Sequence, residues 1–438
     1  MNKKICIVVD HPDRDLNGYI YLISKLKLKQ AVYYLVPYYN FREIYIIRPD
    51  IVILNHSRWI YSNFLKILKI LNTSIFILDT EGGMITMDLI KEYILFSQIK
   101  KNVNYVDGFF IWSDKIKEEI LKLNKNLDDK KLIVTGNPRF EYIYSRRKKK
   151  INGNVLFNLN FATVNPKFST IENEIKLLIK QGKSRNYLKN YVAHQKKMQK
   201  KFIELIKFVS ESKLKKIVIR PHPYESKKIY ETIFKDKKNI EINHTRNLIQ
   251  EISNSSVVIQ NNCATAIDAV LLSRPTFFYK PFKSKYLDQK LISDISFVYK
   301  SKKDVLFNIL SLKNKKNLYN KKSLNLINKK YSTLNGGISL IEKTLKSKFK
   351  KNNNKYIDMF ALLLRYKEFF YFTKTLAKVY LGLRFTNYFR AQFSKKCINI
   401  NLLYDFINAD PKFKSFFKKK KISNFEKYSK NFFSIKIN

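Results

Sequence analysis

Short apolar runs alternate with helical patterns over roughly the first third of the chain. The runs cover residues 5–9, 31–36, 51–54, 74–78, 108–112 and 132–134. Short apolar strands that alternate with helices are typical of a parallel sheet buried on both faces. The pattern therefore predicts an α/β domain with Rossmann-like character over residues 1–148.

The middle of the chain repeats this alternation after a polar break. The break is a run of arginine and lysine residues that ends at Gly153. Further strand-like runs lie near residues 155–159, 216–220, 238–242, 256–260 and 276–279. A long polar helix is expected from about 171 to 210. We predict a second Rossmann-like domain over residues 149–345, and two such lobes facing each other make a central cleft.

The composition changes again after Leu345, and we predict a C-terminal helical extension over residues 346–438. Three asparagines at 352–354 form a linker, and residues 356–392 mix aromatic, aliphatic and basic side chains. Such a segment fits an anionic membrane surface, with aromatic rings at the headgroup level and lysines toward lipid. Packing of the same rings on the globular body is the plainer interpretation, and the sequence does not separate the two.

Charge and cysteine content narrow the class of protein. The 438 residues carry a formal net charge of +50, nearly all from lysines spread along the chain. No nucleic-acid recognition signature accompanies that charge, so we expect no nucleic-acid partner. Three scattered cysteines argue against a disulfide framework or a zinc site. Without a signal peptide or a membrane span, we expect a cytoplasmic protein, and attachment to the inner face of the cytoplasmic membrane stays open.

An acidic turn follows the fourth apolar run. Asp79-Thr80-Glu81-Gly82-Gly83 comes directly after the strand predicted to end at Leu78. Carboxylates at a strand end project toward the edge where open α/β sheets bind ligands. There, Glu81 or Asp79 is a candidate general base for a sugar hydroxyl. The alternative is an ordinary turn with a solvated acid pair.

A basic motif ends the second run of the middle region. Arg220-Pro221-His222-Pro223-Tyr224-Glu225 follows the apolar residues 217–219. The two prolines restrict the backbone around His222, and the imidazole and the Arg220 guanidinium are suited to a phosphate. A packing or capping role for His222 is the alternative, and we favour the phosphate.

The last motif opens a predicted helix. It runs Gln260-Asn261-Asn262-Cys263-Ala264-Thr265 and continues to Asp268-Ala269. Main-chain N–H groups of Ala264 and Thr265 and the Thr265 hydroxyl are candidates for holding phosphate oxygens. Asp268 is a candidate for ribose hydroxyls. A simple helix cap by Asn262 or Thr265 is the alternative, and Cys263 is interpreted as a small buried residue.

Taken in order, these motifs resemble those of the bacterial surface carbohydrate biosynthesis proteins. The resemblance covers residues 1 to about 345. It rests on Arg14-Asp15, 79–83, Thr135-Gly136-Asn137-Pro138-Arg139-Phe140, Asn158-Leu159-Asn160-Phe161, 220–225 and 261–269. It implies a GT-B-like fold and a looser similarity to sialyl-, polysialyl- and Kdo-transferases and to CDP-glycerol polymerases. Two departures are Ala264, where a hydroxyl residue is usual, and Ser273, where glycine is common before Pro275.

The resemblance also implies roles for the matched residues. Glu81 or Asp79 is the general base, His222 meets the donor phosphate and Thr265 supports it. The donor-binding candidates are Arg220, His222, Asn262, Ala264, Thr265 and Asp268. The substrate-binding candidates are Arg14, Asn137, Arg139, Asn160 and Glu225. A CMP-activated sugar acid is the expected donor.

These observations lead to one leading hypothesis. We expect an inverting glycosyltransferase of capsule or lipopolysaccharide synthesis that transfers a nonulosonic acid or Kdo to a glycan or lipid-linked glycan. We expect no metal and no cofactor beyond the donor, because no Asp-x-Asp run that resembles a metal-binding motif appears in the first lobe and protein groups can stabilise the departing phosphate. The alternatives are a CDP-polyol phosphotransferase and a non-catalytic, membrane-docked scaffold of the capsule machinery.

Overall fold

The computed structural model contains two compact α/β units. It describes residues 3–57, 62–80, 102–147, 153–180, 183–212, 216–243, 247–312, 321–332, 336–349, 398, 400–418, 420–426 and 433–438. The first unit combines Met1–Tyr142 with Asn328–Asn438, and the second is Ile143–Ile327. The second unit is thus an insertion in the first. The domain ranges drawn from composition assign residues 328–345 to the second domain, whereas the contacts group them with the first.

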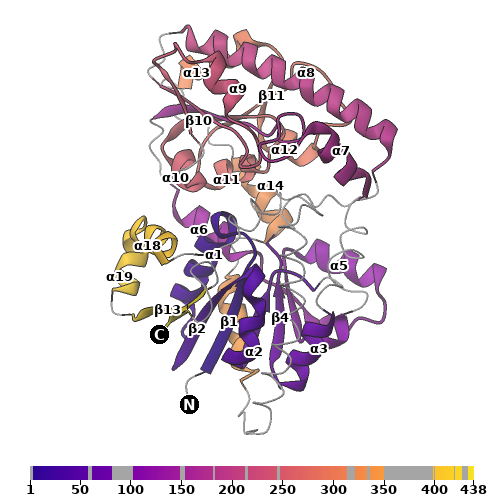
Figure 1. Ribbon diagram of the computed structural model, residues 1–438, viewed down its shortest axis with the longest axis vertical. Helices are drawn as coiled ribbons and strands as arrows, with labels where there is room; N and C mark the ends of the chain where they lie inside the picture. Colours follow the sequence, from indigo (N-terminus) through magenta and orange to yellow (C-terminus); the bar gives the residue numbers. More distant parts are fainter. Residues whose placement is uncertain are drawn as a thin grey trace, which may run out of the picture. The chain divides into compact units, whose positions relative to one another are not determined.

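The sheet of the first unit is built around parallel strands. Its order within the described ranges is β13-β14-β2-β1-β3-β4-β5-β6, and β1 to β6 pair in parallel (Figure 1). These six are β1 (Lys3–Val9), β2 (Ala31–Pro37), β3 (Ile51–Leu54), β4 (Ser74–Leu78), β5 (Gly108–Ile111) and β6 (Leu132–Val134). The side chains of β3, β4 and β5 are buried throughout, as expected for a sheet covered on both faces.

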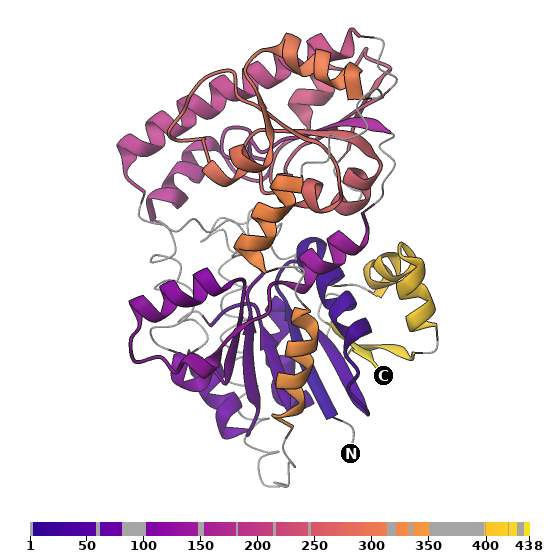
Figure 2. The same ribbon diagram turned by 180° about the vertical axis from the view of Figure 1, so that it is seen from behind.

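Helices and short 3-10 turns connect these strands. They are α1 (Pro12–Lys25), η1 (Tyr38–Glu43), α2 (Ile44–Ile47), α3 (Ser62–Ile70), η5 (Val103–Tyr105), α5 (Asp114–Leu123), η6 (Asp129–Lys131) and α6 (Pro138–Ser145). Helix α1 begins with Pro12, carries Asp13 and Asp15 in its first turn and ends at Lys25, a distribution that suits the helix dipole. After the second unit, α15 (Gly337–Lys346) returns to lie over this sheet (Figure 2).

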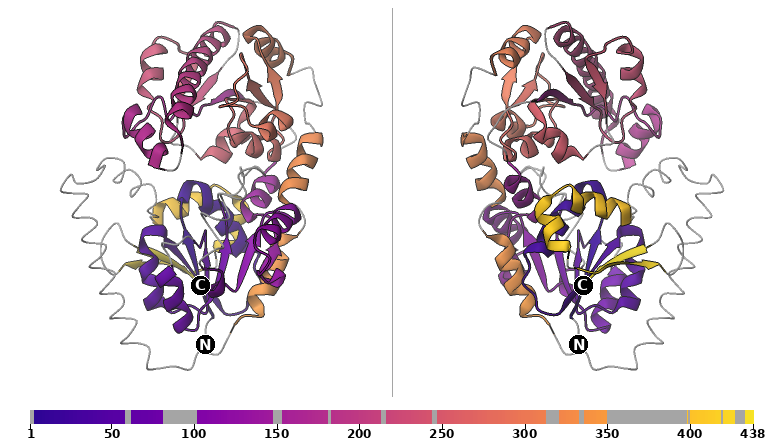
Figure 3. Two further views of the ribbon diagram at one scale, coloured as in Figure 1. Left: turned by 90° about the vertical axis from the view of Figure 1, so that its right-hand side faces the viewer. Right: turned by 90° about the vertical axis from the view of Figure 1, so that its left-hand side faces the viewer.

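The C-terminal region is only partly helical. Helices α18 (Ile400–Asn408) and α19 (Pro411–Phe417) lie against α1. The chain then forms an antiparallel hairpin of β13 (Ile422–Glu426) and β14 (Phe433–Ile437), and β14 pairs with β2 (Figure 3). The predicted helical extension is thus helical at α18 and α19 and differs from the prediction at its end, because pairing with a distant edge strand selects a hairpin there. Residues 356–392, the proposed lipid-facing segment, lie outside the described residues.

The second unit has a parallel sheet with Rossmann-like strand order. Its order within the described ranges is β12-β11-β10-β7-β8-β9, which in chain order reads 6-5-4-1-2-3. The strands are β7 (Asn154–Asn158), β8 (Ile217–Arg220), β9 (Ile240–Ile242), β10 (Ser255–Gln260), β11 (Thr276–Tyr279) and β12 (Phe297–Tyr299). The order reverses between β7 and β10, and ligands of such sheets bind at the carboxyl ends beside that reversal.

The helices of the second unit surround this sheet (Figure 1). They are α7 (Ile171–Lys180), α8 (Arg185–Ser210), α9 (Lys228–Ile233), α10 (Leu248–Ser253), α11 (Thr265–Leu271), α12 (Lys290–Ile295), α13 (Lys302–Ser311) and α14 (Lys321–Tyr331), which continues into the first unit. The single helix expected from 171 to 210 is two helices, because Ser184 caps a new N-terminus by accepting a 3.2 Å bond from the Tyr187 amide. The predicted fold of two Rossmann-like units is confirmed, and the predicted cleft between them stays a prediction.

Candidate functional site

An ionic network occupies the carboxyl edge of the first sheet. Arg14, in the first turn of α1, donates from Nε to Asp15 Oδ1 at 2.6 Å and from Nη2 to Asp10 Oδ2 at 3.1 Å. The same Nη2 lies 3.1 Å from Thr80 Oγ1. Asp10 follows β1 and Thr80 follows β4, so the guanidinium of Arg14 connects two strand ends that are far apart in sequence. The Arg14 charge is balanced by acids of its own unit.

A buried polar chain extends this network toward β3. Asn55, the first residue after β3, donates from Nδ2 to Thr80 Oγ1 and to the Tyr19 hydroxyl, each at 3.1 Å. Tyr19 is buried, and burial raises the pKa of its hydroxyl well above the usual value. In the part of the chain that the structure describes, no hydrogen bond reaches the buried Asn55 Oδ1. This acceptor is available to a ligand or a water molecule.

The motif from Thr135 to Phe140 is hydrogen-bonded to the start of the acidic turn. Asn137 donates from Nδ2 to the main-chain oxygen of Asp79 at 2.9 Å, and its Oδ1 accepts from the Arg139 amide at 2.8 Å. Arg139 Nε in turn donates to the main-chain oxygen of Arg14 at 3.1 Å. Gly18 permits this approach, since a Cβ there would lie 2.9 Å from Arg139 Cα. Asn137 and Arg139 thus position the other motifs, and their direct contact with substrate stays a prediction.

The structure brings Asp79, Thr80, Arg14, Asn137 and Arg139 together at one edge. Asp79 is half-buried at the end of β4. Glu81 lies outside the described residues, as do Gly82 and Gly83. The assignment of the general base to Glu81 or Asp79 therefore stays a prediction.

Amide groups join the strand ends at the order reversal of the second sheet. Asn158, the last residue of β7, donates from Nδ2 to Thr265 Oγ1 at 3.0 Å. One loop further, the Asn160 amide donates to Asn261 Oδ1 at 2.9 Å, and Asn261 Nδ2 donates back to the Asn160 oxygen at 3.0 Å. These bonds fix the loop after β7 against the loop after β10 without using a charged group.

His222 lies one strand away, after β8. Its Nδ1 accepts a 3.2 Å bond from the Tyr224 amide, and its ring stacks on Tyr224 with centroids 5.7 Å apart. Because Nδ1 accepts, a neutral imidazole carries its proton on Nε2 and presents a donor there. Arg220 ends β8 and is largely buried. The motif therefore combines an oriented imidazole with a guanidinium at the edge predicted for phosphate.

Glu225 joins the loop after β7 to the loop after β8 by hydrogen bonds. Its Oε2 accepts from the amides of Phe161 at 2.9 Å and His222 at 3.3 Å, and its Oε1 accepts from the Tyr230 hydroxyl at 2.5 Å. The side chain is fully buried, and burial raises its pKa although these bonds oppose the shift. Direct contact of Glu225 with substrate stays a prediction, whereas its hydrogen bond to the His222 amide is observed.

The start of α11 has no side-chain cap, in contrast to the alternative interpretation of its motif. Ala264 is the N-cap residue and has no capping side chain, so the cap by Asn262 or Thr265 is wrong. Asn262 instead adopts a left-handed φ of 65° and accepts from the Gln289 amide at 3.0 Å. Thr265 and Asp268 are nearly buried. Cys263 is half-buried as a residue and not the fully buried one expected, although burial of its thiol raises the pKa of that group.

No group of three or more His, Cys, Asp or Glu side chains within the described ranges has an arrangement that holds a metal ion. No helix among these residues is both long and apolar enough to cross a bilayer.

Sequence reasoning missed several residues of both edges. Asp10, Tyr19 and Asn55 belong to the first network, and Asn158 and Asn261 belong to the second as bond-forming side chains. Four of them directly follow or end an apolar run, which was the available signal. Tyr19 gave no such signal, because it lies among the apolar positions of a helix that are expected to pack on a core.

Comparison with known proteins supports the architecture. A scan against protein-family models and a search of curated proteins both find no match. Among solved structures, the chain is similar to a proposed UDP-N-acetylglucosamine 2-epimerase from Listeria monocytogenes, at 11% identity and a TM-score of 0.52, over 81% of this chain and 98% of that one. It is also similar to the UDP-GlcNAc 2-epimerase of Neisseria meningitidis bound to UDP-GlcNAc, at 13% identity, 78% and 100% coverage and a TM-score of 0.47.

A third similarity is to the wall teichoic acid polymerase TagF, at 12% identity, 80% and 89% coverage and a TM-score of 0.46. Of these three, the Listeria structure alone exceeds a TM-score of 0.5. It shows the fold only, because the identity is too low to carry a function. The GT-B-like α/β fold is confirmed, while the looser similarity to sialyl-, polysialyl- and Kdo-transferases stays a prediction.

Proposed function

We propose that the protein is a glycosyltransferase of bacterial surface-polysaccharide synthesis that takes its sugar from a nucleotide donor. The observation that carries the proposal is the hydrogen-bonded carboxyl edge of the second unit. There β7, β8 and β10 bring Asn158, His222 and Thr265 to the reversal of strand order. Sheets of this order bind nucleotides at that edge.

The donor phosphate is assigned to the basic side of this edge. The proposed phosphate contacts are the His222 imidazole, the Arg220 guanidinium, the main-chain N–H groups of Ala264 and Thr265, and the Thr265 hydroxyl. Asn262 and Asp268 complete the proposed donor side. A CMP-linked nonulosonic acid or Kdo is the proposed donor, which follows from the motif resemblance.

The acceptor is assigned to the first unit. A carboxylate of the acidic turn, Glu81 or Asp79, takes the proton from an acceptor hydroxyl, whose oxygen bonds to the anomeric carbon of the donor. The bond from that carbon to the phosphate oxygen breaks with inversion, and the nucleotide leaves against His222. The acceptor is a glycan or a lipid-linked glycan, so we propose action in the cytoplasm or at the inner face of the membrane.

Nucleotide binding tests this proposal directly. Calorimetric titration of CMP, CDP, UDP and GDP into the full chain should show selective binding of a cytidine nucleotide, and His222→Ala should weaken it by about tenfold or more. His194→Ala is the matched control, since His194 lies in the same unit and bonds to Ser284 at 2.6 Å. Both variants are checked for native circular dichroism first.

Each other outcome changes the proposal in a defined way. Selective binding of UDP or GDP that is lost in His222→Ala keeps the site and replaces the donor class. Binding that is unchanged in His222→Ala removes the assigned donor site. No binding of any nucleotide favours the scaffold alternative.

A further inference from the structure

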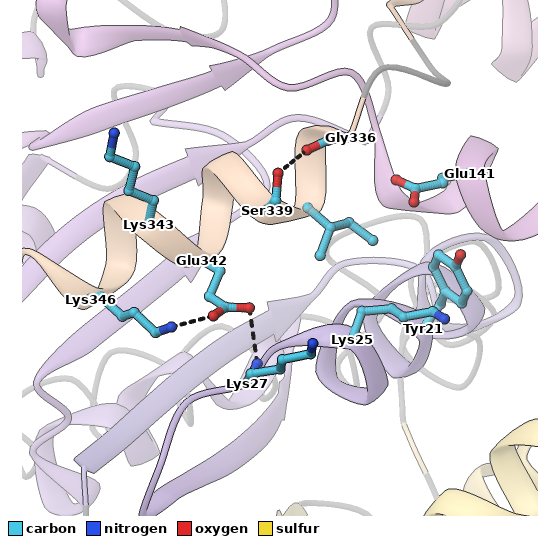
Figure 4. Close-up of a pocket in the computed structure, with 10 residues that line it drawn as sticks. Tyr21, Lys25, Lys27, Glu141, Gly336, Ser339, Glu342, Lys343 and Lys346 are labelled. Carbon is cyan, nitrogen blue, oxygen red and sulfur yellow. Dashed lines mark hydrogen bonds and ion pairs between the residues drawn. The ribbon is translucent and has the colours of Figure 1, made fainter.

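A pocket in the first unit lies apart from both strand edges. It opens between α1 and α15, with α6 at one side (Figure 4). Its volume is about 610 Å³, which is the size of a small-molecule site and far larger than a single ion needs. Its walls are Tyr21, Lys25, Lys27, Glu141, Gly336, Ile338, Ser339, Glu342, Lys343 and Lys346. We call it the basic pocket.

The charges of the basic pocket do not cancel. Among its described lining residues, lysines outnumber glutamates by four to two. Glu342 is already engaged, because Oε1 pairs with Lys346 Nζ and Oε2 accepts from the Lys27 amide at 3.0 Å. These bonds lower the pKa of Glu342, so its carboxylate stays ionised. The Lys25 and Lys27 ammonium groups form no ion pair within the described part of the chain, and they leave a positive field.

One wall of the basic pocket is apolar and rigid. The Tyr21 ring lies 5.7 Å from Tyr142 and 6.4 Å from Phe413, which hold it in place. Lys25 Nζ lies 5.4 Å from the centroid of the same ring. Ile338 adds a nearly buried aliphatic surface. A ligand that fills this space therefore needs an organic body as well as a negative charge.

Glu141 narrows the ligand class further. It is half-buried at the α6 side of the basic pocket, and burial raises its pKa. A carboxyl group there disfavours a small free anion but accepts hydrogen bonds from hydroxyl groups. A sugar ring satisfies both ends, with hydroxyls toward Glu141 and an anionic substituent toward Lys25 and Lys27.

We propose that the basic pocket binds an anionic saccharide, a sugar ring that carries a phosphate or a carboxylate. This site is separate from the nucleotide edge of the second unit, and it does not depend on the function proposed above. Tyr21 and Ile338 contact the ring, Lys25 and Lys27 bind the anionic group, and Glu141 accepts from ring hydroxyls.

Titration of glucose 6-phosphate into the full chain at constant salt tests the proposal. Lys25→Gln/Lys27→Gln should weaken binding by about tenfold or more, since two charged hydrogen-bond donors are removed. The matched control is Lys29→Gln/Lys414→Gln, which removes the same charge at exposed positions outside the basic pocket. Lys343→Gln should have a smaller effect, because its ammonium group extends away from Lys25 and Lys27 in Figure 4.

Four outcomes would overturn the proposal. Equal weakening by both double variants would show attraction by net charge alone. Loss of binding in His222→Ala would place glucose 6-phosphate at the nucleotide edge. Equal binding of inorganic phosphate would show a simple ion site. Binding to phosphatidylglycerol vesicles that needs Lys25 and Lys27, without binding of glucose 6-phosphate, would identify a lipid headgroup instead.

Discussion

The carboxyl edges of the two sheets differ in how they are held together. In the first unit, the Arg14 guanidinium is bound by two carboxylates, those of Asp10 and Asp15. In the second unit, Asn158 bonds to Thr265 through neutral groups, and the nearby ionisable groups include the basic Arg220 and His222. The same architecture thus gives one edge joined by a guanidinium and carboxylates, and another joined partly by neutral amide and hydroxyl groups, with the buried Glu225 carboxylate bonded to the His222 amide.

Removal of a buried acid from the first edge should have the largest effect. Asp15 accepts from Arg14 Nε at 2.6 Å, from Arg14 Nη2 at 3.0 Å and from the His11 amide at 3.0 Å, and it is almost fully buried. Asp15→Ala should lower the free energy of unfolding of the first unit by about 3 kcal/mol, because charged donors lose their acceptor. Urea unfolding followed by tryptophan fluorescence reports this unit, since both tryptophans of the chain fall within residues 1–142.

The control for that variant lies in the same helical turn. Asp13 is exposed and also lies in the first turn of α1, where a negative charge interacts favourably with the helix dipole. Asp13→Ala should cost below about 1 kcal/mol. Equal losses for Asp13→Ala and Asp15→Ala would show that the ionic network does not hold this edge.

A smaller effect is expected at the edge of the second unit. Asn158→Ala removes the bond to Thr265 Oγ1 and should lower the free energy of unfolding of the second unit by about 1 kcal/mol. Because no ion is involved, this loss should be the same in low and high salt. Hydrogen exchange of the β7 and β10 amides measures it, and Asn154→Ala, at the opposite end of β7, is the control. A strong salt dependence would contradict the contrast between the two edges.

The smallest effect should appear in the pH dependence of the first unit. Burial lowers the pKa of His11 from its usual value, Arg14 lowers it further, and Asp13, Asp15 and Asp10 oppose this. As pH falls below about 6.5, the unfolded chain takes up a proton at His11 that the folded unit binds less readily. The free energy of unfolding should therefore decrease toward acid pH, and His11→Gln should flatten the curve below about pH 6.5. An unchanged slope would mean that His11 does not contribute.

The parallel strands were predictable because their signal is local. The apolar runs at β3, β4 and β5 are buried on both faces, so every position selects an apolar residue. Strand β14 was not predictable in this way. It depends on pairing with β2, which lies at the other end of the sequence, and its own residues give only a short mixed pattern.

The candidate site was predictable where a motif ends a strand. His222, Arg220 and Thr265 were identified because each follows an apolar run and has a chemically distinctive side chain. The partners of these residues were harder to find. Tyr19 and Asn55 meet only after α1 packs on β1, the neighbour of β3, and the spacing of residues within either segment does not predict that contact.

The pairing of β14 with β2 has a consequence for the order in which the chain folds. All strands of the second unit are synthesised before β14 emerges, so that unit can complete its sheet while the first still lacks its outermost strands. Until then, β2 presents unpaired main-chain groups along a sheet edge, a surface prone to association with other chains. The hairpin of β13 and β14 therefore covers the edge of β2 only at the end of synthesis. Ribosome-bound chains that stop before Ile422 should be the species that most need a chaperone.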